Sequence, residues 1–258
     1  GIDPDDLDEY VAEGDTASTR SRKPRREKVL GVTGHSLGFQ AGINGSFPQV
    51  MERYSLGDPG EDQGHFGIQP GFQVGANINY VLNDHFEISA DLIFNLVRFS
   101  YAATPLTDIS YKYIENGNHF QLPVSLIYLL NPESEALTYY ARAGVVADYL
   151  LSAHGSGTRT SDATGNEVSV GKTELTGSRN QINLLWMAGM GIRYPLNRSF
   201  FYAEARFSLG ILQSNRAENR YMNNDLNWML YHVDSDFRTH QICICAGICW
   251  DITKEEDL

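Results

Sequence analysis

The sequence predicts an all-β protein, an eight-stranded antiparallel up-and-down transmembrane β-barrel with an N-terminal extension. From Leu37 onward, apolar residues alternate with small or polar ones in eight segments, and a period of two is the signature of a strand with one apolar face. Short and long connections between these segments also alternate strictly. That alternation is typical of a membrane barrel with tight turns at one rim and long loops at the other.

Each predicted strand is placed by its apolar stripe. In chain order, the stripes begin at Leu37, Phe72, Phe86, Phe120, Leu137, Ile182, Phe201 and Ile242. The strands that they define cover residues 37–44, 72–80, 86–96, 120–128, 137–149, 182–194, 201–211 and 241–250. No charged residue falls on any of these stripes. Pro123 fits poorly, because a closed sheet has no free edge to accommodate its missing N–H, and we expect a bulge or a kink there.

The connections divide into two sets. Three are short and carry turn residues, at 82–85, 131–136 and 195–199. Four are long and polar, at roughly 48–71, 97–118, 152–180 and 213–238. In this topology both termini lie at the rim of the short turns, which in bacterial outer-membrane barrels is the periplasmic side.

Composition argues against two classes of protein. The net charge of −12 argues against a nucleic-acid partner, because phosphate contacts need clustered Lys and Arg. No apolar run approaches the roughly 20 residues of a membrane helix. The chain begins at Gly1 without a recognisable signal peptide, and we interpret it as a mature or trimmed chain.

Alternation by itself also fits a soluble barrel with an apolar core, such as a lipocalin. Two features favour the membrane. All five Lys residues lie outside the predicted strands, whereas a water-facing surface normally carries many. The polar faces are rich in small residues that suit the narrow interior of eight strands, and their charges are of both signs.

These inward charges predict a structural polar network in the lumen. Its members are Glu87, Asp91, Arg142, Asp148, Arg193, Glu204 and Arg206. Because buried charges must be paired, we expect the tight 195–199 turn to bring Arg193 close to Glu204.

Aromatic residues form two bands, as the two interfaces of a membrane select. The band at the short-turn rim comprises Tyr80, Phe86, Tyr128, Tyr139, Tyr194, Phe201 and Trp250. The band toward the other rim comprises Phe72, Phe94, Phe120, Tyr149 and Trp186. The sequence therefore predicts lipid around the barrel.

Three cysteines, Cys243, Cys245 and Cys249, share one face of the last strand. Cys243 and Cys245 would stand about 6.6 Å apart along the strand, which suits a disulfide poorly. A metal site would need more ligands than this segment offers. We expect the cysteines to act as small residues that pack the interior.

The chain ends are set apart from the barrel, which is predicted over 35–252. Residues 1–34 combine a short acidic helix, with Asp3 as its cap and Pro4 in its first turn, and a basic linker over 16–28. We expect this segment to be a periplasmic arm, and residues 253–258 to be an acidic tail.

Several motifs resemble those of the PorT-like outer-membrane β-barrels that are common in Bacteroidetes. They lie at 119–124, 140–144, 149–152, 188–194 and 201–210, within a resemblance that spans about 36–252 and omits the arm. The resemblance implies location in the bacterial outer membrane. PorT belongs to machinery that secretes proteins across that membrane, so the resemblance also implies a secretion role.

Three functions follow as hypotheses. The first is a non-enzymatic structural or interaction subunit of a larger outer-membrane secretion or assembly complex, because eight strands leave room for side chains and not for an aqueous channel. Its partners would be outer-membrane lipid or lipopolysaccharide, and outer-membrane or periplasmic proteins bound by the long loops and residues 1–34. It requires no cofactor.

The second hypothesis is an enzyme that modifies outer-membrane lipids, which needs a nucleophile and a base in hydrogen-bond reach. The candidates are Ser100, His119, His154, Ser152 and Ser156. The third is a small-ligand or Ca²⁺ binder that uses oxygen ligands from Asp58, Glu61 and Asp62, in the stretch 57–64.

Overall fold

The computed structural model describes residues 34–54, 64–106, 108–134 and 136–252. The strands are β1 (His35–Glu52), β2 (His65–Val81), β3 (Phe86–Leu106), β4 (Ile109–Leu129), β5 (Thr138–Ser161), β6 (Glu167–Glu174), β7 (Ile182–Pro195), β8 (Ser199–Gly210) and β9 (Asp236–Asp251). Three single-turn or two-turn helices interrupt the connections: η2 (Thr176–Ser178), η3 (Ala217–Asn219) and η4 (Asp225–Leu230). In these described ranges no helix is both long and apolar enough to cross a bilayer.

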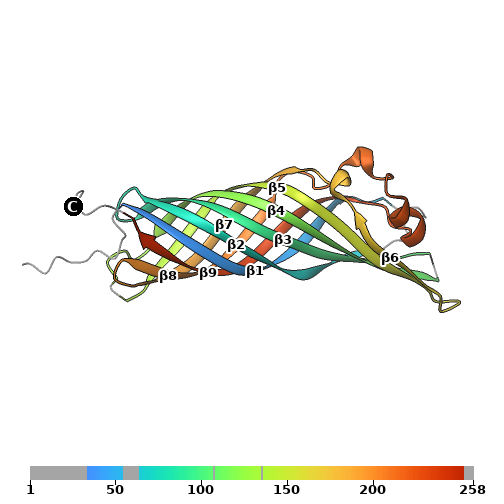
Figure 1. Cartoon of the computed structure of the whole chain (residues 1–258), viewed down its shortest axis with the longest axis horizontal. Helices are drawn as coiled ribbons and strands as arrows, with labels where there is room; N and C mark the ends of the chain where they lie inside the picture. The colour runs from blue at the N-terminus through green and yellow to red at the C-terminus, as the bar shows by residue number, and fades with distance from the viewer. Residues whose placement is uncertain (1–33, 55–63, 107, 135, 253–258) are drawn as a thin grey trace, which may run out of the picture.

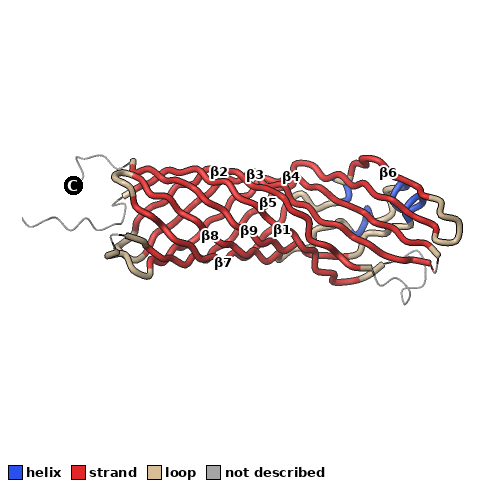
Figure 2. The backbone as a smooth tube through the Cα atoms, turned by 90° about the horizontal axis from the view of Figure 1, so that it is seen from below, coloured by secondary structure: helices blue, strands red, loops and turns tan. Residues whose placement is uncertain are grey.

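Eight of the strands close into an antiparallel ring, which confirms the predicted barrel (Figures 1 and 2). The order around the ring is β1, β2, β3, β4, β5, β7, β8 and β9, and β9 pairs again with β1. The remaining strand, β6, pairs with the outer part of β5. It forms a hairpin that the sequence pattern does not predict.

The two rims of the barrel differ. At the turn end, β2–β3, β4–β5 and β7–β8 are joined by the three short connections that the sequence predicts. Both ends of the described chain lie there, where the Ile252 N–H donates to the His35 carbonyl over 2.9 Å. The opposite rim, the loop end, carries the long connections. The predicted arm (apart from Gly34) and the predicted tail 253–258 lie outside the described residues.

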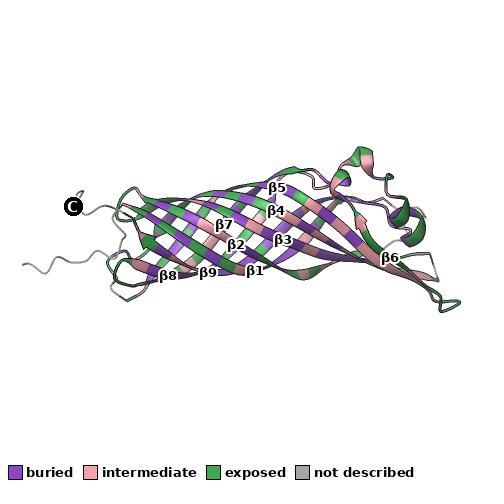
Figure 3. Cartoon of the chain, viewed as in Figure 1, coloured by how far each residue is buried: buried purple, intermediate pink, exposed green. Residues whose placement is uncertain are grey.

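Exposed and buried residues alternate along the strands of the barrel (Figure 3). The exposed residues are mostly apolar and many of the buried ones are polar, so the outer surface is apolar and the inner surface is polar. Leu92 is 54% exposed, whereas its neighbour Asp91 is 1% exposed. The predicted turn-end aromatic residues all point outward, and Phe72, Phe120, Tyr149 and Trp186 do so in the second band. Such a surface is stable in hydrocarbon and unfavourable in water.

Small residues make room for the inward side chains. A Cβ atom at Gly191 would lie 2.5 Å from the Tyr140 ring, and one at Gly247 would lie 2.6 Å from the Tyr202 ring. Glycine at these two positions lets both tyrosines fill the lumen.

The predicted loop over 97–118 is wrong, because β3 and β4 continue as a paired hairpin through most of it. Parts of the predicted loops 48–71 and 152–180 are also strand, and 213–238 contains η3 and η4. The reason is a reversal of polarity beyond the second aromatic band. There the inward residues become apolar, as at Phe99 and Tyr113, and the outward ones become polar, as at Asn116.

We call the structure beyond that band the loop-end lobe: the outer parts of β3, β4, β5 and β9, with β6 and the segments 175–181 and 211–235. Its core is apolar and buried. The core residues include Phe99, Tyr101, Tyr111, Tyr113, Leu150, Val170, Leu175, Leu226, Leu230 and Phe237. The long connections therefore fold into a packed unit on top of the barrel.

The bulge that we expect at Pro123 lies elsewhere. The β3–β4 register is the same on both sides of this residue, with Ala90 opposite Val124 and Ile93 opposite Gln121. The irregularity of β4 falls instead between Asn118 and His119, in its pairing with β5. It lies where the strand leaves the aromatic band and enters the lobe.

Candidate functional site

The lumen near the turn end is closed by one ion pair. Arg193 on β7 donates hydrogen bonds of 2.7 and 2.8 Å to the two carboxylate oxygens of Glu87 on β3. The Arg193 guanidinium also lies over the rings of Tyr140 and Phe200, at 4.9 and 4.6 Å. The pair joins strands that are not neighbours, so it spans the barrel interior.

The expected contact between Arg193 and Glu204 is therefore wrong. The β7–β8 register places Arg193 opposite Tyr202, and Glu204 opposite Gly191. Side chains in so narrow a barrel reach across the lumen, and a short turn between two strands does not decide their partners.

A balanced four-residue cluster fills the middle of the lumen. Arg142 lies 3.3 Å from Asp91 and 3.3 Å from Glu204. Arg206 lies 3.3 Å from Asp91 and also pairs with Glu204. The Tyr140 hydroxyl donates to Glu204 over 2.6 Å. Two carboxylates thus face two guanidinium groups, which satisfies the pairing that buried charges require.

Polar side chains continue from this cluster toward the loop end. His119 Nδ1 lies 2.9 Å from Asp148 Oδ2, and Gln121 donates to the other oxygen of Asp148 over 3.0 Å. Gln121 and Asn95 both donate to Gln241. The structure thus places all seven residues of the predicted network inside the barrel.

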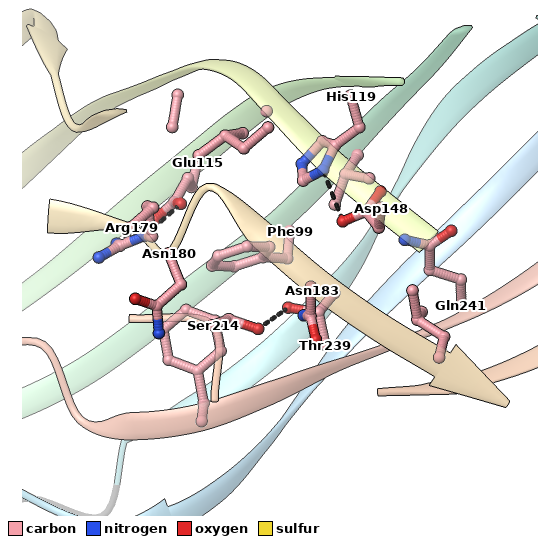
Figure 4. Close-up of a pocket in the computed structure, with 16 residues that line it drawn as sticks. Phe99, Glu115, His119, Asp148, Arg179, Asn180, Asn183, Ser214, Thr239 and Gln241 are labelled. Atoms are coloured by element: carbon pink, nitrogen blue, oxygen red, sulfur yellow. Dashed lines mark hydrogen bonds and ion pairs between the residues drawn. The ribbon is translucent and has the colours of Figure 1, made fainter. Parts of the chain in front are cut away.

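A small cavity lies on the loop-end side of these polar side chains, between the lumen and the lobe (Figure 4). His119, Asp148, Asn183 and Gln241 line it from the barrel, and Phe99 lines it from the lobe. Its volume is about 40 Å³, which is room for a few water molecules. The lumen therefore contains solvent-sized space and no open channel among the described residues.

A buried arginine holds the loop-end lobe together. Arg179, just after η2, donates to both carboxylate oxygens of Glu115 on β4, over 2.7 and 2.5 Å. It also donates to both oxygens of Asp234, over 2.7 and 3.0 Å. His232 stacks on Tyr113 at 4.7 Å, and its Nε2 lies 3.3 Å from Asp234. We call Arg179, Glu115 and Asp234 the lobe clamp.

Burial and charge act in opposite directions on Asp234. Burial favours a higher pKa for this carboxyl, but the Arg179 guanidinium and the hydrogen bonds from Arg179 and His232 outweigh it and hold the pKa well below its usual range. At Tyr113, burial and the neighbouring Glu115 charge act together, and both raise the pKa of the phenol. The clamp is therefore stable with Asp234 ionised and Tyr113 neutral.

Acid is expected to weaken the lobe through Asp234. A carboxyl whose pKa is lowered by folding contributes stability at pH values above its unfolded pKa of about 3.9, and this contribution is lost as the pH falls further. Hydrogen exchange over 211–235, corrected for the pH dependence of the intrinsic exchange rate, measures the loss of lobe stability between pH 7 and pH 3. Asp234→Asn should show a smaller fall in lobe stability over that interval than the unchanged protein, and equal falls would contradict the assignment.

The three cysteines are free and buried in the lumen wall. Asn77 and Asn79 direct their side-chain amides at Cys249 Sγ, at 3.3 and 3.6 Å. The sulfur atoms thus pack the interior, as the spacing predicts.

The candidate nucleophiles and bases do not come together. Ser100 pairs with Gln69 and Gly67, Ser152 accepts from Asn118, and His154 pairs with Glu174. In the described ranges no hydrogen bond joins Ser100, Ser152 or Ser156 to His119 or His154. Asp58, Glu61 and Asp62 lie outside the described residues. Among the residues that the structure describes, no group of three or more His, Cys, Asp or Glu side chains could hold a metal ion.

Sequence reasoning missed the lobe clamp. Glu115 could have been found, because it lies an even number of residues from Gln121 and His119 along β4 and so points inward as they do. Arg179 and Asp234 could not, since both lie in irregular segments whose positions depend on the packed lobe.

Comparison with known proteins agrees with the class that this fold defines, a β-barrel of the outer membrane. The model of the family described as "Outer membrane protein beta-barrel domain" matches residues 20–215. The chain belongs to that family. No curated protein sequence matches it.

The chain is similar to several solved outer-membrane barrels. Neisserial surface protein A is 13% identical with a TM-score of 0.40, and the match covers 85% of this chain and 99% of that one. OprG from Pseudomonas aeruginosa is 10% identical with a TM-score of 0.43, covering 86% and 98%. Ail, the attachment invasion locus protein of Yersinia pestis, is 12% identical with a TM-score of 0.33, covering 84% and 99%.

Proposed function

We propose that this outer-membrane barrel is a non-enzymatic structural or interaction subunit of a larger outer-membrane complex. The observation that carries the proposal is the filled lumen: the Glu87–Arg193 pair and the balanced central cluster bridge it from wall to wall. Bulk transport needs an open path, which this arrangement blocks. The long connections instead fold into a packed lobe at the loop end.

In the membrane placement that we propose, both termini lie in the periplasm. Short turns and chain ends share one rim, and in outer-membrane barrels the short turns are periplasmic. Residues 1–34 would then reach periplasmic proteins, while the lobe would face the cell exterior and its lipopolysaccharide.

The finer assignment is to the PorT-like group and to secretion or assembly of proteins. It is supported by the motifs at 119–124 and 201–210, which include the cavity residue His119 and the lumen residues Glu204 and Arg206. In such a complex the barrel would serve as a rigid anchor, because its interior is cross-linked by ion pairs.

Chemical crosslinking and mass spectrometry of the native membrane test the proposal. We expect one or more defined outer-membrane or periplasmic partners, with crosslinks that are lost when residues 1–34 are deleted and the barrel still inserts. A protein that remains monomeric and free of partners would contradict the role. A change in lipid acylation on deleting the whole protein would instead favour a lipid-modifying enzyme.

A further inference from the structure

Large apolar side chains are exposed on the connection between β8 and β9. Trp228 is 69% exposed, and Met229, Tyr221 and Met222 are also exposed. All four lie in the stretch 221–229, which overlaps η4. We call them the aromatic platform. Exposed apolar groups of this size, gathered on one short segment, are typical of interaction sites.

The platform is held rigidly on the lobe. The inner face of η4 buries Leu226 and Leu230, and Leu230 packs against Gly157 of β5. Asn223 accepts from the Leu226 N–H and donates to the Glu174 carbonyl. A segment fixed in this way loses little conformational freedom on binding, which favours affinity.

The end of η4 adopts a backbone conformation that local preference alone does not explain. η4 is a π-helix, and Tyr231 after it has a positive φ of 58°. The Arg159 guanidinium lies 4.4 Å from the centre of the Tyr231 ring. Such features cost free energy and cluster at functional sites.

The platform stands too far out to rest on lipid. Gly157, against which Leu230 packs, follows Tyr149 of the second aromatic band by eight residues in β5. With about 3.3 Å per residue and a tilt of about 40°, this is roughly 20 Å along the barrel axis. The headgroup layer extends only about 5–8 Å beyond the hydrocarbon.

The size and composition of the platform fit a protein partner. With about 200 Å² taken for each large side chain, the exposed fractions correspond to about 500 Å². A standard protein interface buries about 800 Å² on each side, with an apolar centre and a polar rim. Trp, Tyr and Met are the residue types enriched at such centres.

Charge around the platform specifies the partner further. Exposed charged residues on η3, η4, β6 and the β5–β6 turn are mostly acidic: Asp162, Glu167, Glu174, Glu218 and Asp225, against Lys172. The half-buried Arg159 and Arg216 and the contact of His154 with Glu174 reduce this acidic excess without cancelling it. An acidic rim attracts Lys and Arg and repels the phosphate groups of a lipid or lipopolysaccharide.

We infer that the aromatic platform, with Trp228 at its centre, is a docking site for an extracellular or outer-membrane protein that offers an apolar pocket bordered by Lys and Arg. This inference rests on the proposed function as an interaction subunit and names the surface and the chemistry of the partner.

Site-specific photocrosslinking in cells of the native strain is the first arm of the test. A photoreactive phenylalanine analogue is placed at position 228, and at position 68 as a control, since Ile68 is also exposed at the loop end. We expect one protein to crosslink at 228 and not at 68, and mass spectrometry identifies it.

The second arm uses that protein in purified form with the detergent-solubilised full chain. Trp228→Ala and Tyr221→Ala should each weaken binding at least about tenfold, as centres of interfaces do, and Ile68→Ala should leave it unchanged. Glu218→Gln combined with Asp225→Asn should slow association and reduce its dependence on salt. All variants change exposed residues, and heat-modified mobility on gels checks that they fold.

Three outcomes would overturn the inference: no protein adduct at 228, an adduct with lipopolysaccharide, or an adduct with a second copy of this chain. Equal affinity of Trp228→Ala and the unchanged protein would do the same. If partners still crosslink to residues 1–34 while no protein crosslinks at position 228, only the docking site is wrong and the proposed function stands.

Discussion

Arg193→Leu is expected to lower the free energy of unfolding by about 3–5 kcal/mol, the loss typical of breaking a buried ion pair. The side chains of Arg193 and Glu87 are 10% and 2% exposed, and they pair over 2.7 Å. Removing the guanidinium leaves the Glu87 carboxylate inside the barrel without a cation. Urea unfolding in detergent micelles, followed by tryptophan fluorescence, measures the change.

Glu87→Leu combined with Arg193→Leu is the matched control. Replacing both members of a buried pair by apolar residues is often neutral or stabilising, so the double variant should recover most of the loss. If the double variant is as unstable as Arg193→Leu alone, the cost arises from lost packing on Tyr140 and Phe200 and not from the uncompensated charge.

Arg179→Met is expected to open the loop-end lobe while the barrel stays folded. The clamp residues Glu115 and Asp234 have side chains that are 5% and 9% exposed. Without Arg179, two buried carboxylates of like charge face each other, and we expect about 3–5 kcal/mol of local stability to be lost. Hydrogen exchange should rise over 175–181 and 211–235.

The control for this experiment is the barrel wall itself. Exchange over 182–195 and 199–210 should be unchanged in Arg179→Met, because β7 and β8 pair with each other and with the neighbouring strands β5 and β9. A uniform rise across the chain would show that the clamp stabilises the whole protein. Unchanged protection in the lobe would show that apolar packing, through residues such as Phe237 and Leu230, is sufficient.

The membrane-spanning part of the fold could be predicted because a single physical rule applies to it. Leu92 must meet hydrocarbon and Asp91 must avoid it, so the alternation is strong and every strand shows it. The lobe obeys the opposite rule, with Phe99 and Tyr113 turned inward. An outward apolar stripe therefore ends at Phe120 although the strand continues to Ile109.

The partners inside the barrel were harder to predict than its walls. The alternation along each strand shows that Arg193 and Glu204 both point inward. It does not show which residues lie opposite each other or how far apart two side chains are across the lumen. Arg193 reaches Glu87 on a strand that is far away in sequence and is not its neighbour in the sheet. Pairing of this kind follows from the closed barrel and not from the turn.

Labelling of neighbouring residues tests which side of the wall meets lipid. Leu184 is 38% exposed and Leu185 is 1% exposed, so a single cysteine is placed at each in turn, with Cys243, Cys245 and Cys249 replaced by Ala. In lipid vesicles, a maleimide that partitions into hydrocarbon should label position 184 and leave position 185 unlabelled. Labelling of position 185 alone, or labelling of position 184 by a strictly water-soluble maleimide, would contradict an apolar outer wall around a sealed polar interior.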